Sequence, residues 1–188
     1  MPSGHTPTLL NRHPVCVGDA TSFDSLYLSG TGPGTTNPAI RNHIRHVIPL
    51  TAARTLSADE SGALCIWTTA TGCTATLPSP VIGLWYEFMV AVTNTGTACK
   101  VITSAGTVFI GGGCLTMVDN TTPGANPGPK GFLFDSSASV AVLMGGSDTT
   151  AGGIAGTRFR LTCVSSTLWI VEGLIRAAGT IVTPASAS

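Results

Sequence analysis

The side chains of this sequence that are suited to catalysis are few and scattered. All four histidines lie before residue 54, so a nucleophile in the rest of the chain would have to borrow its general base from that first segment. Neither the G-x-S-x-G pattern of a nucleophile turn nor the H-E-x-x-H pattern of a zinc site is present. The adjacent Asp59 and Glu60 are better explained by capping of a short helical turn than by acid–base chemistry. The sequence therefore predicts a protein that is not an enzyme, with a cysteine hydrolase using Cys65 or Cys114 as an alternative.

One cluster of cationic and imidazole side chains occurs in IRNHIRHVIP, at residues 40–49. It places Arg41, His43, Arg45 and His46 together in a chain that has only nine basic residues. His43 and His46 have the spacing to share a metal on a helix, but a second pair of ligands is not visible, so no metal or cofactor is expected. Two interpretations stay open. The cluster is either a solvated linker or a docking contact in which arginine forks bind carboxylates of a partner.

The six cysteines are scattered, without a C-x-x-C pair: Cys16, Cys65, Cys73, Cys99, Cys114 and Cys163. The N-terminal residues MPSGHTPTLLNRHP contain no apolar segment of the kind found in a secretory leader. We therefore expect buried free thiols rather than disulfide bonds, since thiols stay reduced in a cytoplasm.

Charge is sparse along the whole chain of 188 residues. Charged residues make up 10% of it, against roughly 25% in an average soluble domain. Nine basic and nine acidic residues give a net charge of zero, so we expect no nucleic-acid partner. The uncharged runs are broken well before the ~20 apolar residues of a membrane-spanning helix, so we expect no membrane partner either. From Ser61 to Cys99, Glu87 is the only ionised side chain.

The elements that would position these residues fall into three zones. Residues 1–53 are predicted to be an extended N-terminal arm with one or two short strands, and residues 180–188 a C-terminal tail. Between them, residues 54–179 begin with a capped turn at Ser57–Gly62 and continue as brief runs rich in Val, Ile, Thr and aromatic residues. Turn signals such as NTG, SAG and GGG separate these runs. This rhythm predicts an all-β fold, an antiparallel sandwich or a barrel.

The run LWYEFMVAVT, at residues 84–93, is apolar on both of its faces. One face alternates through Tyr86 and Phe88, and the other carries Trp85, Glu87 and Met89. Such a strand either has both faces covered within its own domain, or presents the second face to another subunit. Interface cores are depleted of charge, which favours the second interpretation for the charge-poor block as a whole.

Four segments of the chain together resemble a module of bacteriophage virion proteins. These are RTLSADESGALCIW, CTATLPSPVIGLWYEFMVAV, KVITSAGTVFIGGG and RFRLTCVSSTLWIVEG, which span about residues 54–173. The pattern is most similar to small head decoration (cement) proteins, and it also recurs in tail-fibre-associated proteins. The segment before Arg54 is not part of it.

The resemblance implies a single antiparallel β-sandwich, jelly-roll-like, without catalytic activity. It also implies a homotrimer on the surface of the capsid in the virion, bound to the major capsid protein after synthesis in the host cytoplasm. Partner contacts are expected from the residues themselves, at Trp85 and Met89 on the second face of the run at residues 84–93 and at Arg41, His43, Arg45 and His46 in the cationic cluster. The resemblance does not cover that cluster. The alternative is a tail-fibre or receptor-binding component that recognises a host surface glycan through exposed aromatic side chains.

Overall fold

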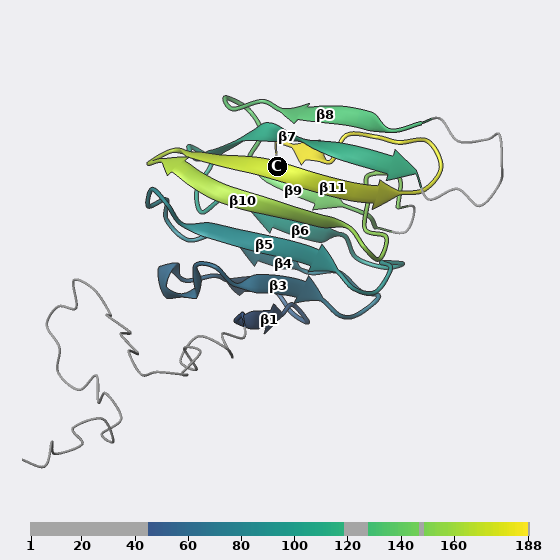
Figure 1. Ribbon diagram of the computed structural model, residues 1–188, viewed down its shortest axis with the longest axis horizontal. Coiled ribbons are helices and arrows are strands. Elements are labelled where there is room, and N and C mark those ends of the chain that lie inside the picture. The colour runs from purple at the N-terminus through teal and green to yellow at the C-terminus, as the bar shows by residue number, and fades with distance from the viewer. Residues whose placement is uncertain (1–44, 119–127, 147–148, 188) are drawn as a thin grey trace, which may run out of the picture. The chain divides into compact units, whose positions relative to one another are not determined.

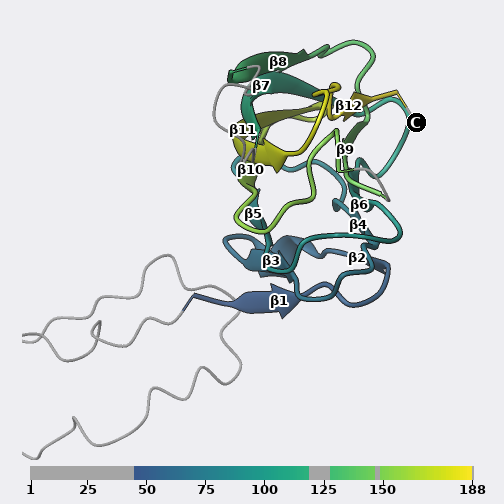
Figure 2. The same ribbon diagram turned by 90° about the vertical axis from the view of Figure 1, so that its right-hand side faces the viewer.

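The structure is a computed structural model that describes residues 45–118, 128–146 and 149–187. Two β-sheets pack face to face around one hydrophobic core (Figure 2). This arrangement confirms the all-β sandwich predicted from the rhythm of short strands. Cys16, Arg41, His43 and most of the expected arm of residues 1–53 lie outside the described residues.

Seven strands form sheet A and five form sheet B. The order in sheet A is β1 (Val47–Pro49), β3 (Leu64–Trp67), β5 (Trp85–Val90), β10 (Arg158–Ser165), β11 (Leu168–Ala177), β7 (Phe109–Val118) and β8 (Lys130–Phe134). The order in sheet B is β12 (Ala185–Ser186), β9 (Ala141–Met144), β6 (Cys99–Ile102), β4 (Thr74–Thr76) and β2 (Arg54–Thr55). Figure 1 looks onto sheet A, with sheet B behind it.

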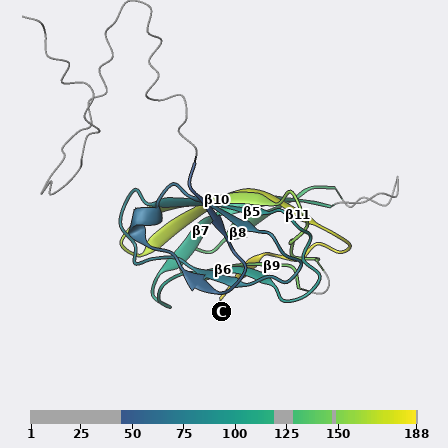
Figure 3. The same ribbon diagram turned by 90° about the horizontal axis from the view of Figure 1, so that it is seen from below.

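The first half of the described chain coils between the two sheets. Strands β1, β3 and β5 lie side by side in sheet A, and β2, β4 and β6 lie side by side in sheet B. Each strand pairs in parallel with the strand two places earlier, because the chain crosses to the other sheet and returns in the same direction. Figure 3 shows the two layers from below.

This coil corrects one detail of the sequence-based expectation. The sheets are mixed rather than purely antiparallel, with five parallel pairs among the ten, so the strand arrangement is not that of an antiparallel jelly roll. The physical reason lies in the connections. Short strands joined through the opposite sheet need no tight hairpin, whereas hairpins are what make neighbouring strands antiparallel.

The structure also shows the conformation of the capped turn, of the GGG run and of the C-terminal tail. The capped turn forms as the 3-10 turn η3 (Ala58–Glu60), in which the Ser57 N–H donates to Glu60 Oε2 at 2.9 Å. Burial alone would raise the pKa of Glu60, but this bond and the Arg54 guanidinium hold it below its ordinary value. The GGG at residues 111–113, predicted to be a turn, is instead the middle of the continuous strand β7. The expected tail contributes β12, which pairs with β9.

Aromatic rings from four neighbouring strands fill the core beneath sheet A. The Phe88 ring on β5 lies 5.2 Å from Phe159 on β10 and 5.7 Å from Trp67 on β3, centroid to centroid. Tyr86 packs 6.0 Å from Trp169 and donates its hydroxyl to Ser57 O at 2.6 Å. These contacts bury one face of β5 completely, as the alternation predicted, and they turn the other face outward.

Candidate functional site

The two outer surfaces of the sandwich differ in chemistry. On sheet B, the outward positions of the central strands β4 and β6 are Thr74, Thr76, Lys100 and Ile102. On sheet A, large apolar side chains surround a cluster of charged ones. We call this surface the outer face of sheet A and define it by Leu64, Ile66, Trp85, Glu87, Met89, Leu115, Met117, Leu133, Arg158, Arg160, Ile170, Glu172 and Leu174.

The strand register arranges these side chains in rows across the sheet. One row runs Leu64, Glu87, Arg160, Glu172, Gly113 and Leu133. The next runs Ile66, Met89, Arg158, Leu174, Leu115 and Gly131. Charges therefore occupy the middle strands β5, β10 and β11, and apolar side chains flank them toward both edges. Leu133 is 85% exposed on the edge strand β8, and Leu115 and Met117 are 46% exposed on β7.

Glu87 is the centre of the charged cluster. Its carboxylate accepts hydrogen bonds from Arg45, which precedes β1, and from Arg158 on β10. Arg45 also donates through Nε to Gly62 O at 2.8 Å, so it fastens the start of the described chain to the loop before β3. Partial burial lowers the pKa of the Arg45 guanidinium, and the nearby Arg160 contributes to that decrease. The isolated charge of the apolar block thus has one partner on β10 and one in the segment before β1.

Trp85 lies beside this cluster with its ring covered by cations. The Arg45 guanidinium carbon is 4.9 Å from the ring centroid, and that of Arg160 is 5.8 Å from it. Both distances are within the range of a cation–π interaction. The indole is therefore held in place by arginines of its own chain.

The structure brings together some of the residues predicted to contact a partner. Arg45, Trp85 and Met89 belong to one surface, centred on Glu87. His46 is exposed, and its backbone carbonyl accepts the Leu64 N–H at 2.9 Å. Arg41 and His43 lie outside the described residues, so the contacts expected of them stay predictions.

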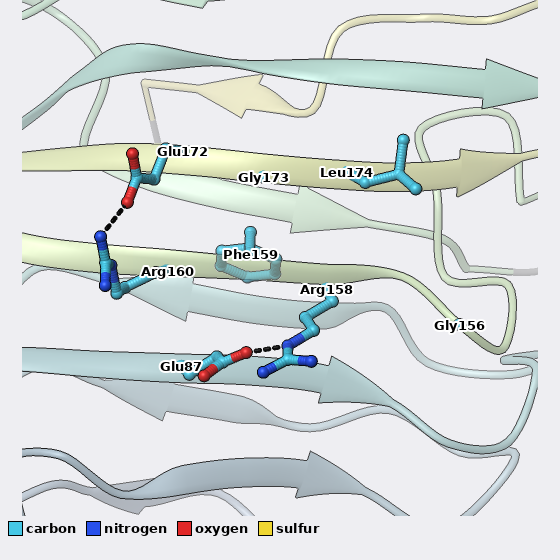
Figure 4. Close-up of a pocket in the computed structure, with 8 residues that line it drawn as sticks. All are labelled: Glu87, Gly156, Arg158, Phe159, Arg160, Glu172, Gly173 and Leu174. Atoms are coloured by element: carbon cyan, nitrogen blue, oxygen red, sulfur yellow. Dashed lines mark hydrogen bonds and ion pairs between the residues drawn. The ribbon is translucent and has the colours of Figure 1, made fainter.

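A hollow of about 620 Å³ opens on this face between β5, β10 and β11 (Figure 4). Its lining consists of Glu87, Gly156, Arg158, Phe159, Arg160, Glu172, Gly173 and Leu174. Arg160 pairs with Glu172 across it, as Arg158 does with Glu87. Gly173 is needed here, because a Cβ at this position would lie 2.4 Å from the Phe159 Cα. The hollow is thus built by a close approach of two strands and is rimmed by guanidinium groups.

Sequence reasoning missed Arg158, Arg160 and Glu172 as candidate functional residues. In RFRLTCV the two arginines alternate with Phe159 and Leu161, and this pattern indicates only that the arginines face away from the core. The signal that relates them to Glu87 is the strand order, which places β10 between β5 and β11. That order joins residues 71 positions apart in the chain.

The cysteines have the character of core residues. Cys65, Cys99, Cys114 and Cys163 are buried free thiols, and Cys73 is a half-buried one, as expected for these five. Burial raises the pKa of Cys65 and of Cys114 to about 12. The thiolate is the nucleophilic form, so these two side chains are unsuited to nucleophilic catalysis at neutral pH. Among the described residues, no three metal-ligating side chains gather into a group.

Comparisons with protein-family models, curated proteins and solved structures gave no match. Within residues 45–118, 128–146 and 149–187, no helix combines the length and the apolarity needed to cross a membrane.

Proposed function

We propose that this chain is a structural subunit without catalytic activity that adheres to other protein subunits through the outer face of sheet A. The specific form of the proposal is a bacteriophage head decoration (cement) protein. It binds the outside of the major capsid protein lattice as a homotrimer and stabilises the head. The resemblance of residues 54–173 to virion proteins supports the head as the place of action.

The observation that carries the proposal is the exposure of large apolar side chains on the outer face of sheet A. Contiguous apolar surface rimmed by polar groups marks an interaction site in soluble proteins. Leu115, Met117 and Leu133 provide such surface, and the charges between the apolar flanks are paired within the chain. A partner covering this face would therefore bury charges that already have partners within the chain, rather than charges left unpaired.

The size of the face fits the same use. Seven strands about 4.8 Å apart span about 30 Å, and strands of about six residues run about 20 Å. The projected area is about 600 Å², close to the ~800 Å² that each partner contributes to a standard stable interface. Many copies on a regular lattice would add avidity to each individual contact.

The alternative of glycan recognition by a tail-fibre component finds less support. Glycan binding of this kind would use exposed indole rings. Trp67 and Trp169 are fully buried, and the Trp85 ring is covered by Arg45 and Arg160. We therefore favour the protein-binding role.

Co-sedimentation with phage heads assembled without this chain tests the proposal. Purified wild-type protein should sediment with the heads and saturate them. Leu115→Ser should weaken the binding about three- to tenfold, because Leu115 is 46% exposed and burying about half of a leucine side chain contributes about 0.8–1.5 kcal/mol. Val182→Ser is the matched control, since Val182 is also 46% exposed but lies outside sheet A. It should bind as wild type does.

Two results would contradict the proposal. One is wild-type protein that stays in the supernatant. The other is a weakening by Val182→Ser that equals or exceeds the weakening by Leu115→Ser. The mass of the free protein in solution, expected to be three times the 19.0 kDa of one chain, checks the trimer separately.

A further inference from the structure

The hollow on the outer face of sheet A is lined by two arginines and two glutamates, and Arg45 binds one of those glutamates from outside the lining. Arg45, Arg158 and Arg160 lie around two carboxylates, those of Glu87 and Glu172. The Glu87 side chain is only 12% exposed and already accepts from two arginines. The Arg158 side chain is 61% exposed and that of Arg160 is 49% exposed. The Glu172 side chain is 59% exposed, so an approaching group meets two exposed guanidinium groups and one exposed carboxylate.

Both exposed arginines have donors beyond those that hold their glutamates. Arg158 binds Glu87 through Nε, and Arg160 binds Glu172 through one terminal nitrogen. A guanidinium carries five N–H donors, so each side chain retains capacity for a second acceptor. The two residues are two positions apart on one face of β10, which separates their Cα atoms by about 7 Å. Figure 4 shows the two side chains turned toward different glutamates, Arg158 toward Glu87 and Arg160 toward Glu172.

The walls next to these donors are apolar. Leu174 lines the hollow, and Met89 and Leu115 lie on either side of Arg158 and Leu174 in the same row of the sheet. We propose that the hollow binds an aspartate or glutamate side chain that a protein partner presents from a segment with apolar neighbours. The carboxylate bridges Arg158 and Arg160, and the apolar neighbours cover Met89 and Leu174. This inference names the partner chemistry at the proposed docking face, and so it rests on that proposed function.

Titration of the isolated, isotope-labelled protein with blocked tripeptides tests the inference without any head. The probe is acetyl-Leu-Glu-Leu-amide, and the matched peptide carries Gln in place of Glu. The Glu peptide should shift the NMR signals of the backbone amides of Gly173 and Leu174. We expect a Kd of about 1 mM, which is reasonable for a single anchoring side chain. The Gln peptide should bind at least tenfold more weakly than the Glu peptide. Raising the salt concentration should weaken the binding of the Glu peptide and leave that of the Gln peptide unchanged.

Variants of the protein show whether the Glu peptide binds in the hollow. Arg158→Gln and Arg160→Gln should each reduce the affinity for the Glu peptide about tenfold. Arg54→Gln should not change it, because Arg54 pairs with Glu60 away from sheet A. The native amide spectrum of each variant shows that it is folded.

Three results would overturn the inference: equal responses to the two peptides, shifts centred away from Gly173 and Leu174, or unchanged affinity in both hollow variants. A stronger response to inorganic phosphate than to the Glu peptide would overturn it in favour of a phosphate site. Peptide binding without binding to heads would contradict the capsid role and leave this inference standing, so the two failures are distinguishable.

Discussion

Thr116 and Thr157 are both fully buried, but their hydroxyl groups have different surroundings. Thr157 Oγ1 accepts the Arg176 N–H at 3.0 Å. Thr116 Oγ1 has no hydrogen-bond partner among the described residues. A buried hydroxyl without a partner costs about 1–3 kcal/mol of desolvation, whereas a satisfied one roughly recovers that cost. The two threonines therefore form a matched pair for measuring the cost of an unsatisfied polar atom in this core.

Thr116→Val is expected to stabilise the fold by about 1 kcal/mol, since valine has nearly the same shape and removes the unpaired hydroxyl. Thr157→Val should destabilise it by about 1–2 kcal/mol, because it leaves the Arg176 N–H without this acceptor. Urea unfolding measures both, as a change in midpoint at constant slope. Equal destabilisation by the two substitutions would show that Thr116 is satisfied in solution.

The sequence predicted part of the residue-scale picture. Alternation along β5 indicated correctly that Tyr86 and Phe88 face one side, and that Trp85, Glu87 and Met89 face the other. The partners of Glu87 were not predictable, because Arg45 and Arg158 lie 42 and 71 residues away along the chain. Long-range ion pairs depend on strand order, and alternation within one strand carries no information about its neighbours.

At the scale of the elements, the glutamates of the outer face have different structural roles. Glu87 joins β5 to β10 and to the residue that precedes β1, and it is mostly shielded from solvent. Glu172 joins only β11 to β10, and its side chain is 59% exposed. Shielded ion pairs cost more to break than exposed ones, because the remaining charge loses its partner where water cannot replace it.

Glu87→Gln should therefore destabilise the protein by about 2 kcal/mol, a value reduced from that of a fully buried pair because Arg158 is well exposed. Glu172→Gln should cost no more than about 0.5 kcal/mol. Thermal or urea unfolding of the two variants, each compared with wild type, gives the comparison. If both substitutions have the same effect, the account of Glu87 as the fastening point of three elements is wrong.

The coil of β1–β6 shows where sequence reasoning failed for the elements. Short β-rich runs between turn residues predicted strands, and the strands exist. The same runs gave no sign that successive strands enter opposite sheets, because a parallel ladder depends on the direction of the return path. The prediction of a turn at the GGG of β7 was wrong for another reason. A Cβ on Gly112 would lie 2.4 Å from Val171 O, so this glycine permits close strand contact rather than a turn.

At the scale of the whole molecule, the scarcity of charge in this β protein has a physical answer in two parts. One face of β5 is covered by the core of its own sandwich. The other belongs to a broad outer face whose few charges are paired and whose apolar flanks are exposed. Composition led us to expect a covering surface, and the structure shows which outer face carries exposed apolar side chains. The identity of the covering subunit is the part that we propose.

Hydroxyl-radical footprinting of the protein, free and bound to heads assembled without it, tests the central claim most directly. Oxidation of Met117 and Leu133 should fall at least fivefold on binding, while oxidation of Val182 stays the same, since only the outer face of sheet A is covered. Unchanged labelling of Met117 and Leu133 in bound protein, or protection of Val182 instead, would contradict the claim that this face is the docking surface.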